Sequence, residues 1–417
     1  MKLLRTASPA ARAVLDALTD NRAAVYERVL PQARRIVDSV RRGGDPALLR
    51  LRARLDSIPS QVQLRIPEVE LRLALESMPA ETRQALRTAA HNIRAFAARQ
   101  LPHSFDLAPA AGVTAGQRVL PIDSVGCYIP SGRYPLPSTL LMTAIPAQVA
   151  GVPRIVAVSP HPAKEALAAA AMLGITEFYR AGGAQAIAAL AYGTRSIPRV
   201  DKIVGPGNAW VTAAKKLVAF DSAIDMLAGP TEILVASETG DPVCIAADLV
   251  AQAEHDPDAV AILITTRAAL ARSVVAETKR QARGNRIAAA ALGKNGLALV
   301  ARSVEEAHEL VNRIAPEHLT VDAAADLAWV RNAGSVFIGR WSAQPLGDYV
   351  SGPNHTLPTS GLARTRGGLS VLDFVRLVTV QEYTQAGVRQ LGPAAIRLAK
   401  AEGLAGHAEA IRQRSAQ

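Results

Sequence analysis

Cysteine is scarce in this chain of 417 residues, which has only Cys127 and Cys244, far apart in the sequence. Their separation excludes a disulfide framework and favours a reducing compartment. No apolar run reaches the length of about eighteen residues that a membrane span needs. The N-terminal stretch "MKLLRTASPAARAVLDAL" also lacks the long apolar core of a secretory signal. The sequence therefore predicts a soluble cytoplasmic protein without a membrane partner.

Aromatic residues are also few, at 4%, and no segment interleaves them with basic residues as nucleic-acid-binding stretches do. Lys and Arg total 47 against 36 Asp and Glu, which gives a formal charge of +11. The cations are spread along the chain and form no block. A solvated basic surface is therefore favoured and no nucleic-acid partner is expected, although a small polyanion such as a dinucleotide remains compatible.

What the sequence has in plenty is alternation between helices and short apolar strands. The helix-like "TLLMTAIPAQVAGV" precedes the strand-like "RIVAVS", and "AKEALAAAAMLGI" precedes "EFYRAG". Further along, "VAILITT", "LALVA", "HLTVD" and "SVFIG" read as strands with helices between them. Such alternation is typical of βαβ units and parallel sheets. Two α/β domains are expected, one inserted within the other, because the helical residues 1–100 need a sheet to cover.

Two glycine-rich turns follow predicted strands. "GPGNAW", from Gly205 to Trp210, departs from the dinucleotide fingerprint because Trp210 stands where Gly or Ala is required. "AGGAQA" forms a similar turn and carries Gln185. Free amides at such turns can hold an anion, and two of them at one end of a sheet would line a ligand crevice. A tight turn without a ligand explains the same residues equally well.

Several polar side chains have the chemistry of metal ligands. The helical stretch "AADLVAQAEHDPDA" places Gln252 and His255 three residues apart on one face. Asp348 lies in the loop "LGDYVSGPNHTLPT", and His407 lies in "AEGLAGHAE" near the C-terminus. Two imidazoles, one carboxylate and one amide oxygen suit Zn²⁺ or a similar divalent ion. Taken singly, Asp348 also fits an ordinary connecting loop, and His407 also fits an exposed residue near the C-terminus.

An adjacent acid and imidazole, Glu317 and His318, occur in "APEHLT". Histidine titrates near neutrality and glutamate can be tuned by burial, so this pair could handle protons. A surface pair at the start of a strand is the alternative interpretation. His355 and Glu402 lie in the same two polar segments as Asp348 and His407, and polar loops often carry function.

Eight motifs, in order along nearly the whole chain, resemble those of the histidinol dehydrogenase family. They are "GCYIP", "GGAQAIAALAYGT", "VDKIVGPGNAWVTAAK", "IDMLAGPTEILV", "DLVAQAEHDPDA", "APEHL", "GDYVSGPNHTLPT" and "AEGLAGH". The resemblance implies an enzyme of the last steps of histidine biosynthesis. It oxidises L-histidinol to L-histidine through L-histidinal with two NAD⁺, and it is a zinc-containing homodimer with one zinc per subunit.

The implied fold is α/β, with two incomplete Rossmann-like domains that contain parallel sheets, and with helical extensions at both termini. The expected division has an N-terminal helical arm over 1–25 and a first α/β domain over 26–125 and 235–368, which carries the zinc and catalytic residues. A second α/β domain over 126–234 forms the NAD side. A C-terminal helical tail over 369–417 reaches the partner subunit.

The resemblance also implies roles for single residues. Glu317 and His318 fall on the catalytic pair, in which His318 takes the alcohol proton and Glu317 activates the water that adds to the aldehyde. The implied NAD contacts are Tyr128, Gln185 and Asn208. The implied zinc ligands are Gln252, His255, Asp348 and His407, the last reaching into the site of the partner subunit. The implied substrate contacts are Thr231, Gln252, His255, His318, Asp348, Glu402 and His407, with His355 nearby.

The sequence departs from the family pattern at two positions. Thr231 replaces an expected serine, which keeps the hydroxyl and adds a methyl group. Ser131 interrupts an expected pair of glycines in the NAD loop. The alternatives are a related NAD-dependent dehydrogenase of another amino alcohol or polyol, and a binding module that kept the fold without catalysis. A sulfonated substrate is disfavoured because Glu402 would repel it.

Replacing His407 by Asn tests the implied ligand set. We expect the purified variant to contain less zinc than the wild type, because one of four ligands is lost. Metal content measured on both proteins decides the matter, and unchanged zinc would remove His407 from the site.

Overall fold

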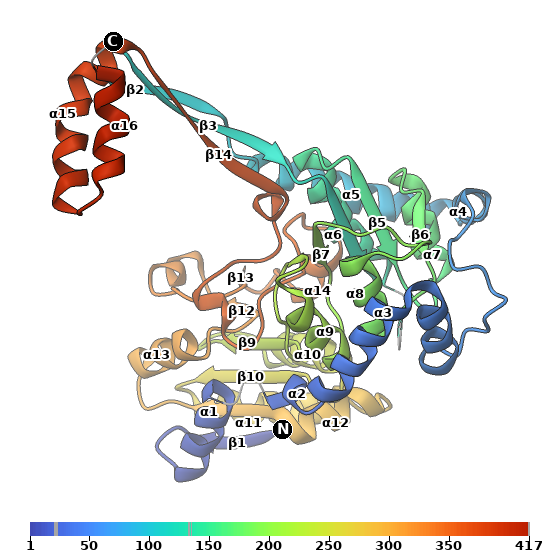
Figure 1. The fold of residues 1–417 in the computed structure, drawn as a ribbon. Coiled ribbons are helices and arrows are strands. Elements are labelled where there is room, and N and C mark those ends of the chain that lie inside the picture. The colour runs from blue at the N-terminus through green and yellow to red at the C-terminus, as the bar shows by residue number, and fades with distance from the viewer. Residues whose placement is uncertain (21–23, 132–133, 135, 416–417) are drawn as a thin grey trace.

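Two parallel sheets form the body of the molecule, and a third, antiparallel sheet carries a pair of helices away from it (Figure 1). The structure is a computed structural model that describes residues 1–20, 24–131, 134 and 136–415. Part of the expected N-terminal arm, and Gly132, Arg133 and Pro135 of the expected NAD loop, lie outside the described residues. The α/β fold with parallel sheets that the sequence predicts is confirmed.

The larger parallel sheet has six strands in the order β1-β11-β10-β9-β12-β13. They are β1 (Lys2–Arg5), β9 (Glu232–Ala236), β10 (Val260–Thr265), β11 (Gly296–Val300), β12 (His318–Val321) and β13 (Ser335–Ile338). The helices around this sheet are α1 (Pro9–Asp20), α10 (Pro242–Ala253), α11 (Ala268–Gln281), α12 (Arg286–Asn295) and α13 (Val304–Ile314). Apolar residues of α10, α11 and α12 form one core, and those of α1 and α13 form another. Because helices cover both faces, the central strands read as continuous apolar runs.

The smaller parallel sheet has five strands in the order β6-β5-β4-β7-β8. They are β4 (Ser124–Tyr128), β5 (Arg154–Val158), β6 (Glu177–Tyr179), β7 (Lys202–Val204) and β8 (Ala223–Ile224). Helices α3 (Leu30–Leu55), α8 (Gly183–Tyr192) and α9 (Ala209–Val218) pack together in one core. The other core contains α4 (Glu68–Glu76), α5 (Ala80–Gln100), α6 (Pro137–Ala150) and α7 (Lys164–Met172). The short α2 (Ala24–Glu27) contacts α9.

The packing of residues 26–125 differs from the grouping expected from the sequence. That grouping placed them with the domain over 235–368, whereas α3, α4 and α5 contact α8, α7 and α6 of the smaller sheet. At the N-terminus, β1 pairs with β11 in the larger sheet, so the expected helical arm begins with a strand. The apolar spacing along a segment indicates which of its faces is buried but not which sheet it will join, which explains both differences. The division into domains itself stays a prediction.

A projecting arm is built from the antiparallel sheet and the C-terminal helices. The sheet has the order β14-β3-β2, and its strands are β2 (Phe105–Ala110), β3 (Val113–Pro121) and β14 (Val375–Tyr383). The helices are α15 (Gln385–Ala401) and α16 (Ala405–Ser415), and Figure 1 shows them at the far end of the arm. The expected helical tail thus begins with a strand, because the β-branched stretch "VRLVTVQEY" finds β3 as an antiparallel partner.

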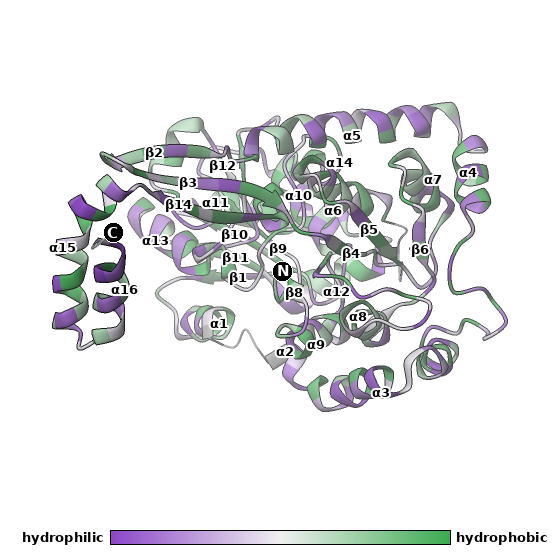
Figure 2. Cartoon of the chain, turned by 45° about the horizontal axis from the view of Figure 1, so that its top comes forward, coloured by the Kyte–Doolittle hydropathy of each residue, from purple (hydrophilic) through white to green (hydrophobic). Residues whose placement is uncertain are grey.

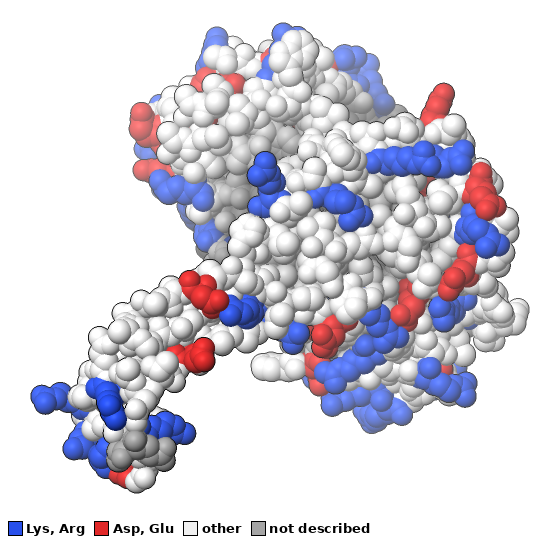
Figure 3. Space-filling view, turned by 90° about the horizontal axis from the view of Figure 1, so that it is seen from above, with Lys and Arg blue, Asp and Glu red and all other residues white. Residues whose placement is uncertain are grey.

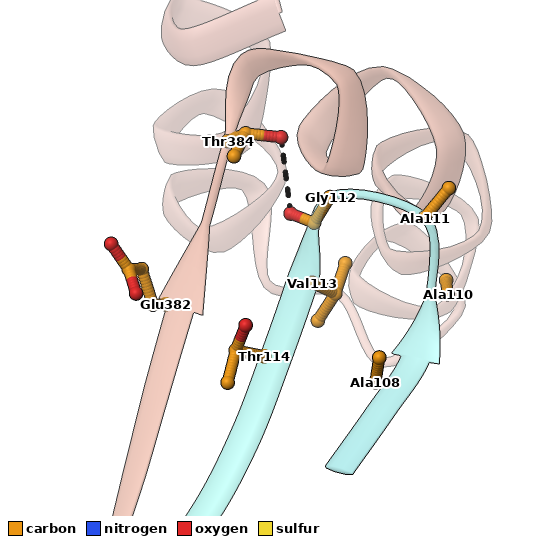
Figure 4. Close-up of a pocket in the computed structure, with 8 residues that line it drawn as sticks. All are labelled: Ala108, Ala110, Ala111, Gly112, Val113, Thr114, Glu382 and Thr384. Carbon is orange, nitrogen blue, oxygen red and sulfur yellow. Dashed lines mark hydrogen bonds between the residues drawn. The ribbon is translucent and has the colours of Figure 1, made fainter. Parts of the chain in front are cut away.

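Two glycines let α15 pack against the turn between β2 and β3. Gly112 has a φ of +74°, and a Cβ there would lie 2.7 Å from the backbone nitrogen of Gly387. Thr384 caps α15 at this point, and its hydroxyl donates to the carbonyl oxygen of Gly112 at 3.1 Å (Figure 4). The small side chains around this turn line a pocket of about 390 Å³. The end of the arm is therefore joined to the hairpin by direct backbone contact.

The surface agrees with the composition. In Figure 2 the strands of the parallel sheets are mostly hydrophobic, whereas hydrophilic segments mark the helices around them. Figure 3 shows Lys and Arg scattered over one face of the molecule with Asp and Glu among them. Within the described part of the chain, none of the helices combines the length and apolar content that crossing a bilayer would require. Short 3-10 turns complete the fold at Ala324–Ala328, Leu362–Arg364 and Val371–Phe374.

Candidate active site

A cavity of about 980 Å³ lies between the two parallel sheets and is lined by residues of both. From the smaller sheet come residues that follow the carboxyl ends of β4 and β7. From the larger sheet come residues at the amino ends of β9 and β12, namely Thr231, Glu317 and His318. The sequence could not predict this opposed arrangement, because it depends on how the two sheets face each other.

The smaller sheet opens toward the cavity at its topological switch point. Strands β4 and β7 are neighbours, but the chain runs from β4 to β5 on one side and from β7 to β8 on the other. In open α/β sheets, ligands bind outside the carboxyl ends of the strands at such a point. The glycine-rich turn Gly205–Asn208 follows β7 here, and the N-termini of α8 and α9 face the same cavity. Both features favour an anionic ligand such as a dinucleotide.

The turn after β7 is held by a buried ion pair. Gly205 has a φ of +111°, and a Cβ there would lie 2.2 Å from the carbonyl oxygen of Tyr128, so only glycine fits. Its amide donates to Asp225 at 2.8 Å, and its carbonyl accepts from Lys215 at 2.6 Å. Lys215 also donates to Asp225 at 2.6 Å, and both side chains are at most 3% exposed. No motif in the sequence indicates this pair.

The three expected NAD residues all line the cavity, and they hold the two helix N-termini in place. Asn208 caps α9 by accepting from the amides of Trp210 and Val211. The hydroxyl of Tyr128 accepts from the amide of Gly183 at 3.2 Å, and burial raises the pKa of Tyr128 to about 12. Gln185 donates to Asp56 at 2.9 Å.

Asp56, at the end of α3, is a cavity residue that the sequence reasoning missed. Its carboxylate also accepts from the amide of Gly182 at 3.0 Å, which fixes the start of α8. Burial raises the pKa of Asp56, although these hydrogen bonds act in the opposite direction. Gln185 and Asp56 are separated by 129 residues in sequence, so nothing local connects them.

The acid–imidazole pair is buried at the start of β12. Glu317 and His318 are 6% and 3% exposed. Oxygen Oε2 of Glu317 accepts from the hydroxyl of Thr231 at 2.6 Å and from the amide of Glu232 at 2.7 Å. Nδ1 of His318 lies 3.0 Å from the carbonyl oxygen of Glu232, so Nδ1 carries the hydrogen and donates it. In the neutral imidazole Nε2 is then the acceptor, and this atom is buried without a hydrogen-bond partner among the described residues.

Asp348 approaches this imidazole from α14 (Gln344–Tyr349). Its Oδ1 lies 3.6 Å from Nε2 of His318, and its Oδ2 accepts from Gln344 at 2.8 Å. Burial disfavours the imidazolium, yet the carboxylates of Glu317 and Asp348 outweigh it and raise the pKa of His318 to about 10. Burial acts to raise the pKa of Asp348, but the neighbouring His318 holds it below its ordinary value. His355 also lines the cavity, and burial lowers its pKa.

Gln252, in the last turn of α10, and His255, in the turn after it, both line the cavity. The sequence predicts one helix through both residues, but α10 ends at Ala253, ahead of Pro257, so a shared helix face does not bring them together. Gln252 is 1% exposed, and its Nε2 donates to the hydroxyl of Thr231. Its Oε1 is buried with no hydrogen-bond partner among the described residues. The structure therefore brings an amide oxygen, an exposed imidazole and the carboxylate of Asp348 to one cavity. In the described part of the chain, no three His, Cys, Asp or Glu side chains cluster closely enough to form a metal site on their own.

Glu402 and His407 are not brought to the cavity of their own chain. Both are exposed on the projecting arm, at the end of α15 and in α16, and neither lines the cavity. Figure 1 shows these helices at a distance from the body of the molecule. Of the expected site residues, Tyr128, Gln185, Asn208, Thr231, Gln252, His255, Glu317, His318 and Asp348 therefore share one cavity.

A parallel α/β fold with a switch-point crevice and a buried acid–imidazole pair defines an enzyme that handles protons beside a bound ligand. The family model for histidinol dehydrogenase matches residues 19–415. The chain belongs to the histidinol dehydrogenase family, and the resemblance found in its sequence is confirmed. Its activity is that of an oxidoreductase of histidine biosynthesis.

Individual relatives resemble the chain over most of its length. The histidinol dehydrogenase of Gluconobacter oxydans is 46% identical over 393 residues, which cover 91% of each chain. That of Brucella suis is 44% identical over 420 residues, which cover 98% of each chain. The crystal structure of the histidinol dehydrogenase from Elizabethkingia anophelis superimposes with a TM-score of 0.88 at 36% identity, covering 93% of this chain and 92% of that one.

The ion pair below the glycine turn gives a stability prediction. Replacing Lys215 by Met leaves Asp225 buried without its cation, so the free energy of unfolding should fall by about 3–5 kcal/mol. Arg42 and Asp38 form an exposed pair 3.7 Å apart. Replacing Arg42 by Met should change the free energy of unfolding by less than about 1 kcal/mol. Urea unfolding of both variants tests the difference, and equal midpoints would contradict it.

Proposed function

We propose that the chain is a zinc-containing enzyme that oxidises L-histidinol to L-histidine through L-histidinal, with two successive hydride transfers to NAD⁺. The supporting observation is the single cavity that brings the switch-point turns of one sheet to the buried acid–imidazole pair and candidate metal ligands of the other. A bound dinucleotide on one side and an amino alcohol on the other would then meet between the sheets.

The donor groups in the cavity fit a divalent ion. Gln252 offers a buried amide oxygen without a hydrogen-bond partner, and Asp348 offers a carboxylate oxygen that faces His318. With His255 and an imidazole from His407, the set contains one anionic group, so a bound ion keeps positive charge and accepts ligands from a substrate. Bound zinc would orient and polarise the substrate, and bound NAD⁺ would accept hydride.

The chain's own residues divide the proton chemistry. In the alcohol step, Nε2 of His318 takes the hydroxyl proton, since Nδ1 is committed to the carbonyl of Glu232. Asp348 would hold the cation, whose charge would offset the carboxylates that raise the pKa of this imidazole and so favour its neutral form. In the aldehyde step, Glu317 activates the water that adds to the carbonyl. The resulting hydrate is the substrate of the second oxidation.

The NAD side consists of Tyr128, Gln185 and Asn208 around the switch point. The N-termini of α8 and α9 suit the pyrophosphate of a dinucleotide, because the helix dipoles favour negative charge there. Ser131 lies beside them, and its hydroxyl accepts from the amide of His161 at 2.9 Å. This contact gives the serine a structural task where the family pattern has glycine.

The arm completes the site of the partner subunit in a homodimer. Glu402 and His407 are exposed far along the arm, and they can serve as substrate and zinc contacts only in another copy of the chain. The arm also exposes apolar side chains that a second subunit would cover, among them Leu107, Leu377 and Leu398. The carboxylate of Glu402 suits the positive end of an amino alcohol.

The substrate contacts in this proposal are Thr231, Gln252, His255, His318, Asp348, Glu402 and His407, with His355 beside them. The alternative is oxidation of another amino alcohol or polyol at the same site. Enclosing one substrate through both oxidations keeps the aldehyde from escaping.

The yield of NADH per substrate distinguishes these possibilities. With Zn²⁺ and excess NAD⁺, complete consumption of L-histidinol should form two NADH per molecule, because the aldehyde is oxidised before release. Absorbance at the end of the reaction gives the number. One NADH per molecule would show that the second step is absent, and no turnover would favour another alcohol.

Subunit mixing tests the shared site. Variants His407→Asn and His318→Asn should each be inactive as homodimers, because each site lacks one essential group. After mixing and exchange of subunits, one site in each heterodimer contains both wild-type histidines, so activity should reappear. A mixture of His318→Asn with Glu317→Gln is the control. Both changes lie in the body of the subunit, so each site of the heterodimer keeps one defect and the mixture should stay inactive. Failure of the first mixture to recover, despite proven exchange, would contradict the shared site.

A further inference from the structure

We propose that the hydroxyl of Thr231 is a positioning group that fixes the orientation of the Gln252 amide, so that its oxygen and not its nitrogen faces the metal ion. This inference rests on the proposed function, because it concerns the zinc site. It assigns Thr231 a task within the chain that is separate from any contact with the substrate.

Glu317 determines which group donates in each hydrogen bond between Glu317, Thr231 and Gln252. Its Oε2 accepts from the backbone amide of Glu232 at 2.7 Å and contacts the hydroxyl of Thr231 at 2.6 Å. An ionised carboxylate has no hydrogen to give, and a threonine hydroxyl has only one. That hydrogen therefore points from Thr231 toward Glu317.

The same polarity decides the orientation of Gln252. With its hydrogen committed, Oγ1 of Thr231 can only accept in its contact with the amide of Gln252. The amide group must then present Nε2 to Thr231, and the opposite end of the planar group is Oε1. That oxygen is buried without a partner among the described residues, in a side chain only 1% exposed.

The orientation matters because the two ends of an amide have opposite polarity. The oxygen is a ligand for a cation, whereas the two N–H groups repel it. Without the hydroxyl, nothing else in the described hydrogen bonds of Gln252 selects one end over the other. The row Glu317–Thr231–Gln252 therefore joins the catalytic carboxylate to a metal ligand through a single hydroxyl group.

Two substitutions at this position separate the hydroxyl from the shape of the side chain. Thr231→Val keeps the branched shape and removes the hydroxyl, whereas Thr231→Ser keeps the hydroxyl. We measure the dissociation constant for Zn²⁺ by competition with a chromophoric chelator, in the absence of NAD⁺ and substrate. Loss of a group that orients a metal ligand weakens binding by about 10- to 100-fold, so Thr231→Val should lose that much and Thr231→Ser should stay near the wild type.

Omitting substrate makes the result specific. A hydroxyl that only touched the substrate would leave zinc affinity unchanged in Thr231→Val and raise the KM for histidinol. Equal zinc affinity of Thr231→Val and wild type would therefore overturn the inference while leaving the proposed function intact. A wild-type protein that binds no zinc would overturn both. Thr231→Ala is measured alongside, since it avoids placing a second methyl group beside Glu317 if the valine variant folds poorly.

A second pair of variants tests orientation directly. Gln252→Glu replaces the amide by a carboxylate, whose two ends are both oxygen, so no orientation can be wrong. In this background, the change Thr231→Val should weaken zinc binding much less than it does beside Gln252. An equal loss in both backgrounds would mean that the hydroxyl acts through something other than the amide orientation, and would overturn the inference.

Discussion

A carboxylate taken out of water must receive hydrogen-bond donors, and this requirement shapes the region between the two sheets. Glu317 receives the Thr231 hydroxyl and a backbone amide. Asp348 receives the Gln344 amide, and Asp225 receives Lys215 together with the amide of Gly205. Each acid fixes the segment that supplies its donors. The turn after β7, the start of β9 and helix α14 are therefore held in place by the same polar contacts that line the cavity.

Buried carboxylates also receive donors at the switch point of the larger sheet, which lies outside the cavity. The larger sheet has its own switch point between β9 and β12, since β9 also pairs with β10. At the carboxyl ends of these strands, Asp322 accepts from the hydroxyl of Ser237 and from the amides of Glu238 and Thr239. A protein carboxylate thus occupies the donors that an anionic ligand would use. The larger sheet is left to contribute its opposite end, where Thr231 and His318 begin the two strands.

The sequence predicted those parts of the molecule that depend on local patterns. Alternating apolar runs predicted the parallel sheets, and the helical pattern predicted α10, although this helix ends at Ala253 and His255 lies beyond it. Contacts between distant segments gave no such signal. Strand β14 pairs with β3 across more than half of the chain, and Asp56 reaches Gln185 from a helix with no motif of its own. Glu402 and His407 lie on the projecting arm, and their distance from the cavity depends on the pairing of β14 with β3, which no local pattern indicates.

In the proposed zinc site, a neutral ligand at position 252 has an electrostatic reason and a structural consequence. Glu317 and Asp348 already place two carboxylates within 3.6 Å of His318. A third carboxylate on α10 would add repulsion between buried acids and would hold the imidazole more firmly in its charged form. An amide supplies oxygen without charge, which leaves the imidazole closer to a usable base. Unlike a carboxylate, however, an amide has only one end that can bind a cation. A site with glutamine as a ligand therefore also needs a neighbouring group that sets the orientation of the amide. The hydroxyl between Glu317 and Gln252 meets that need because the carboxylate determines the direction of its hydrogen.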